Sequence, residues 1–80
     1  MKVTVTITRR PEIADPEGTT VARALHDLGY ASVDDVRFGR TIHLDLAGDD
    51  PAAVRATVVE MCERLLANPV IEDYEVAVDA

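Results

Sequence analysis

Two Asp-Pro pairs, Asp15-Pro16 and Asp50-Pro51, constrain the fold of this chain more than any other feature of its sequence. An aspartate accepts hydrogen bonds from the first free N–H groups of a helix, and proline suits the first helical position because no N–H is needed there. Each pair therefore predicts the start of a helix. Segments with strand periodicity precede and follow both predicted helices, so the chain reads twice as strand, helix, strand.

Three segments alternate apolar and polar residues, as strands with one buried face do. The first runs from Val3 to Ile7, and the last begins at Tyr74. The middle segment runs from Val36 to Leu46, and its even positions are apolar except at Arg40. This periodicity favours one strand bent at Gly39, and a hairpin whose loop contains a bulge remains the alternative.

The two predicted helices each carry one apolar stripe. Gly29 follows the first stripe, and glycine readily adopts the left-handed conformation that ends many helices. Asn68-Pro69 ends the second helix, because proline cannot continue it. The stripes consist of Val21, Ala24, Leu25 and Leu28 in the first helix and of Val54, Val58, Met61 and Leu65 in the second.

These elements predict a single domain, residues 1–80, with an α+β fold. We expect a two-layer sandwich in which an antiparallel sheet is covered by two helices, related to the ferredoxin-like folds. The strand from Val36 to Leu46 reaches roughly 36 Å, whereas the first helix reaches only about 20 Å. We expect a second copy of the chain or another partner to bury the overhang, since a domain this small usually needs an additional source of stability.

The composition excludes several classes of function. Fifteen acidic residues against eight basic ones give a formal net charge of −7, which repels a phosphate backbone and makes nucleic acid an unsuitable partner. Cys62 is the only cysteine, so no internal disulfide forms. The sequence contains no apolar run of the roughly 20 residues that span a bilayer, and it does not open as a signal peptide does. We therefore expect a soluble, cytoplasmic protein that does not bind membranes.

The sequence offers little chemistry. His26 and His43 are the only histidines, and a metal site would need further ligands brought in by folding. Cys62 lies beside the apolar stripe of the second helix, where a buried thiol without a nucleophilic role is expected. No phosphate-binding glycine motif is present. We predict no catalytic, cofactor-binding or metal-binding residue in this chain.

Arg37, Gly39 and Arg40 form the most functional-looking basic group, at the predicted bend of the middle strand. Two interpretations remain open for them. The arginines can form surface salt bridges with the abundant acids, which contribute little to stability. They can also contact a partner.

Three segments carry a resemblance to a known family. Leu65 to Val76 (LLANPVIEDYEV) is the most specific, followed by Asp15-Pro16-Glu17-Gly18 and by Val36 to Ile42 (VRFGRTI). On these segments the chain resembles the PurS family, the small subunit of phosphoribosylformylglycinamidine synthase, over nearly its whole length. Arg40 stands where the family usually has lysine, and residues 10–14 replace a loop that contains glycine.

The resemblance implies a role in assembly. In the family, a glutaminase subunit releases ammonia, and a synthetase subunit uses ATP and Mg²⁺ to activate formylglycinamide ribonucleotide. The small subunit joins these two, assists ammonia transfer and forms a homodimer or a tetramer. A ferredoxin-like or ACT-like regulatory module that binds a small effector at a dimer interface is the alternative. The candidate subunit contacts are Arg37, Gly39, Arg40, Ile42, Leu44, Asn68, Glu72, Asp73 and Tyr74.

Overall fold

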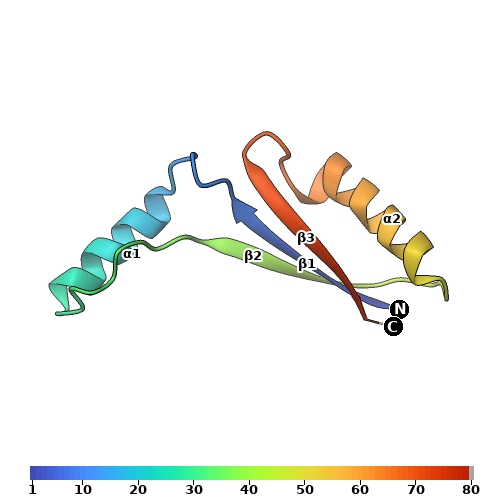
Figure 1. The fold of residues 1–80 in the computed structure, drawn as a ribbon, viewed down its shortest axis with the longest axis horizontal. Coiled ribbons are helices and arrows are strands. Elements are labelled where there is room, and N and C mark those ends of the chain that lie inside the picture. The colour runs from blue at the N-terminus through green and yellow to red at the C-terminus, as the bar shows by residue number, and fades with distance from the viewer. Residues whose placement is uncertain (80) are drawn as a thin grey trace.

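The structure, a computed structural model that describes residues 1–79, is an arch with a sheet and one helix on one side and a second helix projecting from the other (Figure 1). The α+β class and the antiparallel sheet agree with the prediction. The elements in chain order are β1 (Lys2–Arg9), α1 (Pro16–Asp27), β2 (Gly39–Asp45), α2 (Pro51–Met61), the π-helical turn η1 (Cys62–Leu66) and β3 (Glu72–Asp79).

The sheet has the order β2-β1-β3, with both neighbours antiparallel to the central strand. Val5 lies opposite Ile42 on one side and Val76 on the other. Because side chains alternate between the two faces of a strand, this register puts the apolar residues of all three strands on one face. The other face carries threonines and charged residues, and no helix within residues 1–79 covers it.

Helix α2 covers the apolar face of the sheet. Asp50 caps its first turn by accepting a hydrogen bond from the N–H of Ala52. Below the helix, the core is closed by eight small and medium-sized apolar residues: Val3, Val5, Ile7, Val54, Val58, Cys62, Ala67 and Val76. Burial raises the pKa of the Cys62 thiol. The expectation that Cys62 is buried is therefore confirmed.

The end of the second helix differs from the prediction. The N–H of Ala67 bonds to the carbonyl of Cys62, five residues earlier, as in a π-helix. This wider turn keeps Cys62 in the core and rotates Leu65 outward, so that the Leu65 side chain is 82% exposed. Its predicted place on the buried stripe was wrong, because a period of 3.6 residues does not hold through this segment.

Helix α1 does not cover the sheet as predicted. Within residues 1–79, the elements that contact one another extensively are β1 with β2, β1 with β3, and α2 with η1 and with β3. Gly18 is the only buried residue of α1, and Leu28, just after it, is 74% exposed. Within the single chain, the sandwich therefore has one covering helix, and α1 is an arm that extends beyond the sheet (Figure 1).

The middle strand is a single strand, as periodicity favoured, but it begins at Gly39 rather than Val36. Residues 36–38 continue its direction toward α1 without a neighbouring strand. Their main chain is held by the start of α1 instead, through a hydrogen bond from the N–H of Phe38 to Asp15. The apolar alternation was correctly recognised, but alternation alone does not supply a strand partner.

Candidate functional site

The arm meets the sheet at a fastened junction, here called the joint, formed by residues 9–18 and 36–40 and by the turn 66–73. Asp15 is its central residue. One carboxylate oxygen accepts the N–H of Gly18 at 3.0 Å, and the other accepts the N–H of Phe38 at 2.7 Å. These bonds, first that from Phe38, lower the pKa of Asp15. The helix cap predicted from Asp15-Pro16 thus also ties α1 to β2.

Two glycines allow the main chains of the joint to approach closely. A Cβ atom on Gly18 would lie 1.9 Å from the carbonyl oxygen of Val36, and one on Gly39 would lie 2.5 Å from that of Ile7. Neither position has space for a side chain, because the obstructing atoms belong to the backbone. Glycine is therefore required at both positions by proximity.

Two arginines hold the loop between β1 and α1. Arg37 donates to the carbonyl oxygens of Ile13 and Pro11, at 2.7 and 2.6 Å, and Arg9 donates to that of Ala14 at 2.9 Å. These carbonyl oxygens lie outside any strand or helix, so the arginines supply the hydrogen bonds that regular structure would otherwise provide. The salt-bridge interpretation also holds, since the Nε of Arg37 lies 3.5 Å from a carboxylate oxygen of the exposed Asp35, but the two hydrogen bonds to the loop were not expected.

Arg40 and Glu72 form the strongest ion pair of the joint. The guanidinium donates to both carboxylate oxygens, at 2.6 and 3.0 Å, and also to the carbonyl of Leu66. Glu72 in turn accepts the N–H of Asn68 at 2.7 Å. The bonds from Arg40 and then from Asn68 lower the pKa of Glu72, which is 9% exposed. The pair joins β2 to the first residue of β3.

The turn before β3 is rigidly held. The side chain of Asn68 accepts the N–H of Val70, and its carbonyl accepts those of Ile71 and Glu72. Arg10 donates to Pro69 and lies 3.3 Å from a carboxylate oxygen of Asp73. The helical segment ends at Leu66, because Ala67 is already extended, and Asn68 fixes the turn that follows. It does so without a left-handed conformation, since glycines are the only residues from 1 to 79 with positive φ.

The other predicted contact residues lie away from the joint or point to the core. The Tyr74 hydroxyl donates to Glu63 at 2.6 Å, which raises the pKa of Tyr74 to about 12. Ile42 and Leu44 are half-buried and pack against the core on the α2 side. Sequence reasoning missed Arg9, Arg10 and Asp15 as members of the joint. Only the Asp-Pro-Glu-Gly segment gave a signal, and that signal concerned Asp15. Arg10 contacts Pro69, 59 positions away, and Arg9 contacts Ala14 in a loop without a recognisable pattern.

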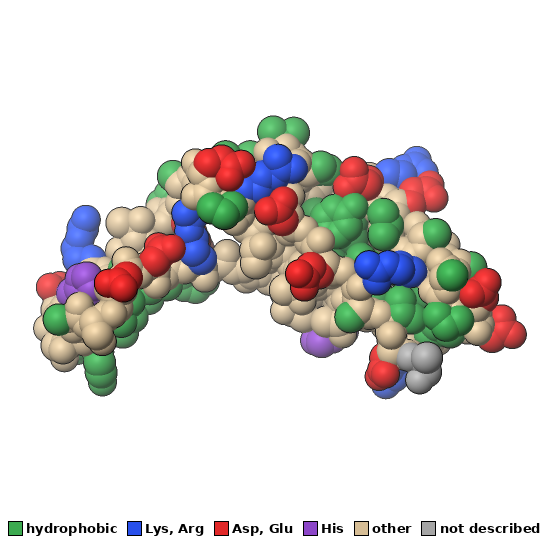
Figure 2. Space-filling view, in the orientation of Figure 1, with side chains coloured by type: hydrophobic (Ala, Val, Ile, Leu, Met, Phe, Trp, Pro, Cys, Tyr) green, Lys and Arg blue, Asp and Glu red, His purple; other side chains and the backbone are tan. Residues whose placement is uncertain are grey.

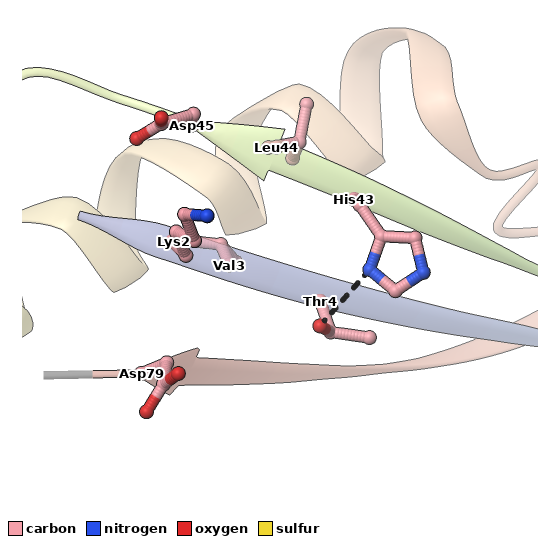
Figure 3. Close-up of a pocket in the computed structure, with 7 residues that line it drawn as sticks. All are labelled: Lys2, Val3, Thr4, His43, Leu44, Asp45 and Asp79. Atoms are coloured by element: carbon pink, nitrogen blue, oxygen red, sulfur yellow. Dashed lines mark hydrogen bonds between the residues drawn. The ribbon is translucent and has the colours of Figure 1, made fainter.

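A shallow hollow of about 370 Å³ lies on the open face of the sheet (Figure 3). His43 contacts Thr4 there, with 3.4 Å between ring Nδ1 and the hydroxyl oxygen, and Lys2 lies between Asp45 and Asp79 in register. These are ordinary cross-strand pairs. Among residues 1–79, no cluster of three His, Cys, Asp or Glu residues could hold a metal ion. No helix there is long and apolar enough to cross a membrane.

We predict that Arg40→Ala lowers the free energy of unfolding by roughly 2 kcal/mol, because it leaves the Glu72 carboxylate without its main partner. Exposure of half of the Arg40 side chain keeps the loss below that of a fully buried pair. Urea unfolding at fixed protein concentration measures the change. Arg64→Ala, which removes only the exposed pair with Glu60, should have less than a quarter of the effect.

The same pair predicts a pH dependence. A lowered carboxyl pKa stabilises the fold fully above its ordinary value, 4.5 for Glu72, and this stabilisation is lost as the pH falls through the lowered value. Wild-type stability should therefore decrease below about pH 4.5, and Glu72→Gln should flatten that decrease. Equal slopes for both proteins would contradict the assigned role of Glu72.

The comparisons with known proteins agree with one another. The family model PurS, described as phosphoribosylformylglycinamidine (FGAM) synthase, matches residues 2–80. Phosphoribosylformylglycinamidine synthase subunit PurS of Methanocaldococcus jannaschii is 42% identical over 98% of this chain and 94% of its own length. The PurS subunit of Bacillus subtilis is 42% identical over 98% and 92%, respectively.

Solved structures extend the likeness to three dimensions. A structure of B. subtilis PurS matches with a TM-score of 0.88 at 42% identity and covers 99% of this chain and 98% of that one. A chain in the structure of PurLQS from Thermotoga maritima matches with a TM-score of 0.86 at 34% identity, covering 95% and 93%. Alignments this complete include the projecting arm as well as the sheet.

Proposed function

This chain belongs to the PurS family of phosphoribosylformylglycinamidine synthase subunits, and we propose on that basis that it is the non-catalytic assembly subunit of such an enzyme. The enzyme uses ATP and Mg²⁺ to convert formylglycinamide ribonucleotide and glutamine to formylglycinamidine ribonucleotide and glutamate, in de novo purine biosynthesis. The chain joins the glutaminase and synthetase subunits and assists ammonia transfer. We also propose a cytoplasmic location, as expected for a subunit of a biosynthetic enzyme.

The extended shape supports an assembly role. The radius of gyration is 16.2 Å, whereas a compact chain of this length has about 12 Å. The accessible surface is 5680 Å², which exceeds the surface of a compact monomer of this mass by roughly 1,000 Å². One partner in a typical stable interface buries about 800 Å². The surplus therefore corresponds to one interface per chain.

The arm and the sheet are complementary, which supports a homodimer. The apolar side of α1 carries Val21, Leu25 and Leu28, and none of the three is buried. Hydrophobic side chains gather on the underside of the arm in Figure 2. The apolar face of β2 and the neighbouring flank of α2, together called the β2-side groove here, carry half-buried or exposed apolar residues: Ile42, Leu44, Leu46, Met61, Leu65 and Leu66.

We place the α1 arm of each chain in the β2-side groove of the other. A hollow of about 340 Å³ between Met61, Leu65 and Leu66 lies on the flank of α2 that also carries Thr57. Thr57 lines a second hollow together with Leu46, so this flank faces β2. A partner arm there gives each sheet the second covering helix that the sequence predicts. The candidate contacts Ile42 and Leu44 then belong to the dimer interface, and the joint sets the direction of the arm.

The regulatory alternative is not favoured, because the relatives and the structures match along the whole chain and carry the synthase name. Four of the remaining candidate contacts support the joint from within the chain: Arg37, Gly39, Arg40 and Asn68. Asp73 and Tyr74, on β3, stay candidates for contact with the larger subunits.

Reconstitution tests the proposed function. The purified chain alone should show no glutaminase or ligase activity, and adding it to the glutaminase and synthetase subunits should restore glutamine-dependent turnover. Ammonium chloride should support the synthetase subunit without this chain, since it bypasses transfer between subunits. Equal glutamine-dependent turnover with and without the chain would rule out the assembly role. Tight binding of an amino acid or nucleotide to the isolated chain would favour the regulatory alternative instead.

A further inference from the structure

The outer edge of β3 pairs with no strand among residues 1–79. This strand is eight residues long and forms the edge of the sheet on the side away from β2. A long unpaired edge offers a row of free N–H and C=O groups to any other strand, so natural sheets protect such edges. The structure shows how this one is protected.

The hydrogen-bonding pattern identifies the groups that point outward. The N–H of Arg10 bonds to the carbonyl of Ile71, which continues the β1–β3 register into a hydrogen-bonded pair. Antiparallel pairs alternate between bonded and non-bonded, so Val5 and Val76 form a non-bonded pair. The N–H and C=O of Val76, and likewise those of Tyr74 and Val78, therefore point away from β1.

Arg55 occupies the centre of this edge. It extends from α2 and donates from Nη1 to the outward carbonyl of Val76. An incoming strand needs the same carbonyl as an acceptor and must first displace the guanidinium. Exchange of a charged hydrogen bond for a neutral one is unfavourable, so Arg55 acts as a block on edge pairing.

Apart from this block by Arg55, the β3 edge of one copy can pair with the β3 edge of a second copy. Two β3 strands paired antiparallel about Val76 place Tyr74 opposite Val78, which is an apolar pair. On the open face the same register places Asp73 opposite Asp79, and like charges facing one another oppose pairing. A twofold axis through Val76 makes this contact the same on both copies, which is how dimer interfaces close.

We propose that the β3 edge is a latent interface for a second copy of this chain and that Arg55 keeps it closed. This inference goes beyond the proposed function, because it concerns what limits the number of copies that associate. With Arg55 in place, the arm-exchanged dimer cannot extend its sheets into a tetramer or fibre through β3. Without it, pairing joins two dimers through a continuous sheet.

The test uses Arg55→Gln, which retains a polar residue with good helix propensity. Analytical ultracentrifugation of the variant should show association beyond the wild-type state, with the association constant raised at least tenfold. Arg23→Gln is the control, because it removes the same charge from an exposed residue outside the proposed contacts and should leave the association unchanged. Arg55→Gln/Asp79→Asn should associate more strongly still.

A second variant ties the result to this edge. The N–H of Val78 points outward, so Arg55→Gln/Val78→Pro loses no bond to β1 but cannot accept a neighbouring strand, and it should return to the wild-type mass. Hydrogen exchange gives an independent readout, since the amides of Tyr74 and Val78 should exchange rapidly in the wild type and become protected in Arg55→Gln. Wild-type mass and wild-type exchange in Arg55→Gln up to millimolar concentration would overturn the proposal. Association that persists with Val78→Pro would do so too.

Discussion

Replacing Leu28 with aspartate is expected to separate the proposed dimer at concentrations where the wild-type chain is fully paired. Leu28 is 74% exposed in the single chain, so the substitution costs the isolated fold at most about 0.5 kcal/mol. In the β2-side groove of a partner, the carboxylate would replace an apolar contact with Met61, Leu65 and Leu66, and the only cation lining the hollow is the exposed Arg64, which already pairs with Glu60. Burial of the carboxylate there costs roughly 3 kcal/mol, which raises the dissociation constant on the order of 100-fold.

Sedimentation velocity across a dilution series measures this change, and Arg23→Glu supplies the control. Arg23 is exposed on the side of α1 opposite Leu28, and its replacement alters the net charge by two, more than Leu28→Asp does. The control should stay dimeric, which separates apolar burial from general charge repulsion. A Leu28→Asp protein with the wild-type dissociation constant would show that the arm does not form the interface.

The elements of this fold followed from local patterns in the sequence. Asp15-Pro16 and Asp50-Pro51 mark the starts of both helices, and alternation located all three strands. Such signals are reliable because capping and alternation depend on residues a few positions apart. The position of α1 could not be derived in the same way. Its apolar stripe requires a cover, but nothing in a single sequence states whether that cover belongs to the same chain.

The joint shows the same limit at the level of single residues. Gly18 and Gly39 were recognised as parts of family motifs, yet their physical reason is a close approach to carbonyl oxygens 18 and 32 positions away in the chain. Arg40 was placed at the surface with abundant acids, and its specific partner, Glu72, became evident only in three dimensions. Long-range pairs of this kind connect segments whose local patterns are independent of one another.

Gly18→Ala is expected to redirect the arm and weaken the dimer while leaving the sheet intact. Alanine is the better helix former by about 1 kcal/mol, so local propensity alone predicts a gain in stability. The new Cβ would lie 1.9 Å from the carbonyl oxygen of Val36, and neither backbone can yield without moving α1 away from residues 36–38. That movement breaks the hydrogen bonds of Asp15 to both segments. Steric overlap therefore outweighs propensity.

We expect the dissociation constant of Gly18→Ala to rise at least tenfold, with the largest amide shift changes in NMR spectra at Gly18 and Phe38 and small changes along β1 and β3. Thr20→Ala, an exposed substitution in the same helix, should leave both measurements near the wild type. If Gly18→Ala instead dimerised normally and gained stability, the joint would be flexible enough to accept a side chain. The direction of the arm would then be set by the partner chain, because the remaining contacts of α1 within its own chain are too few to fix it.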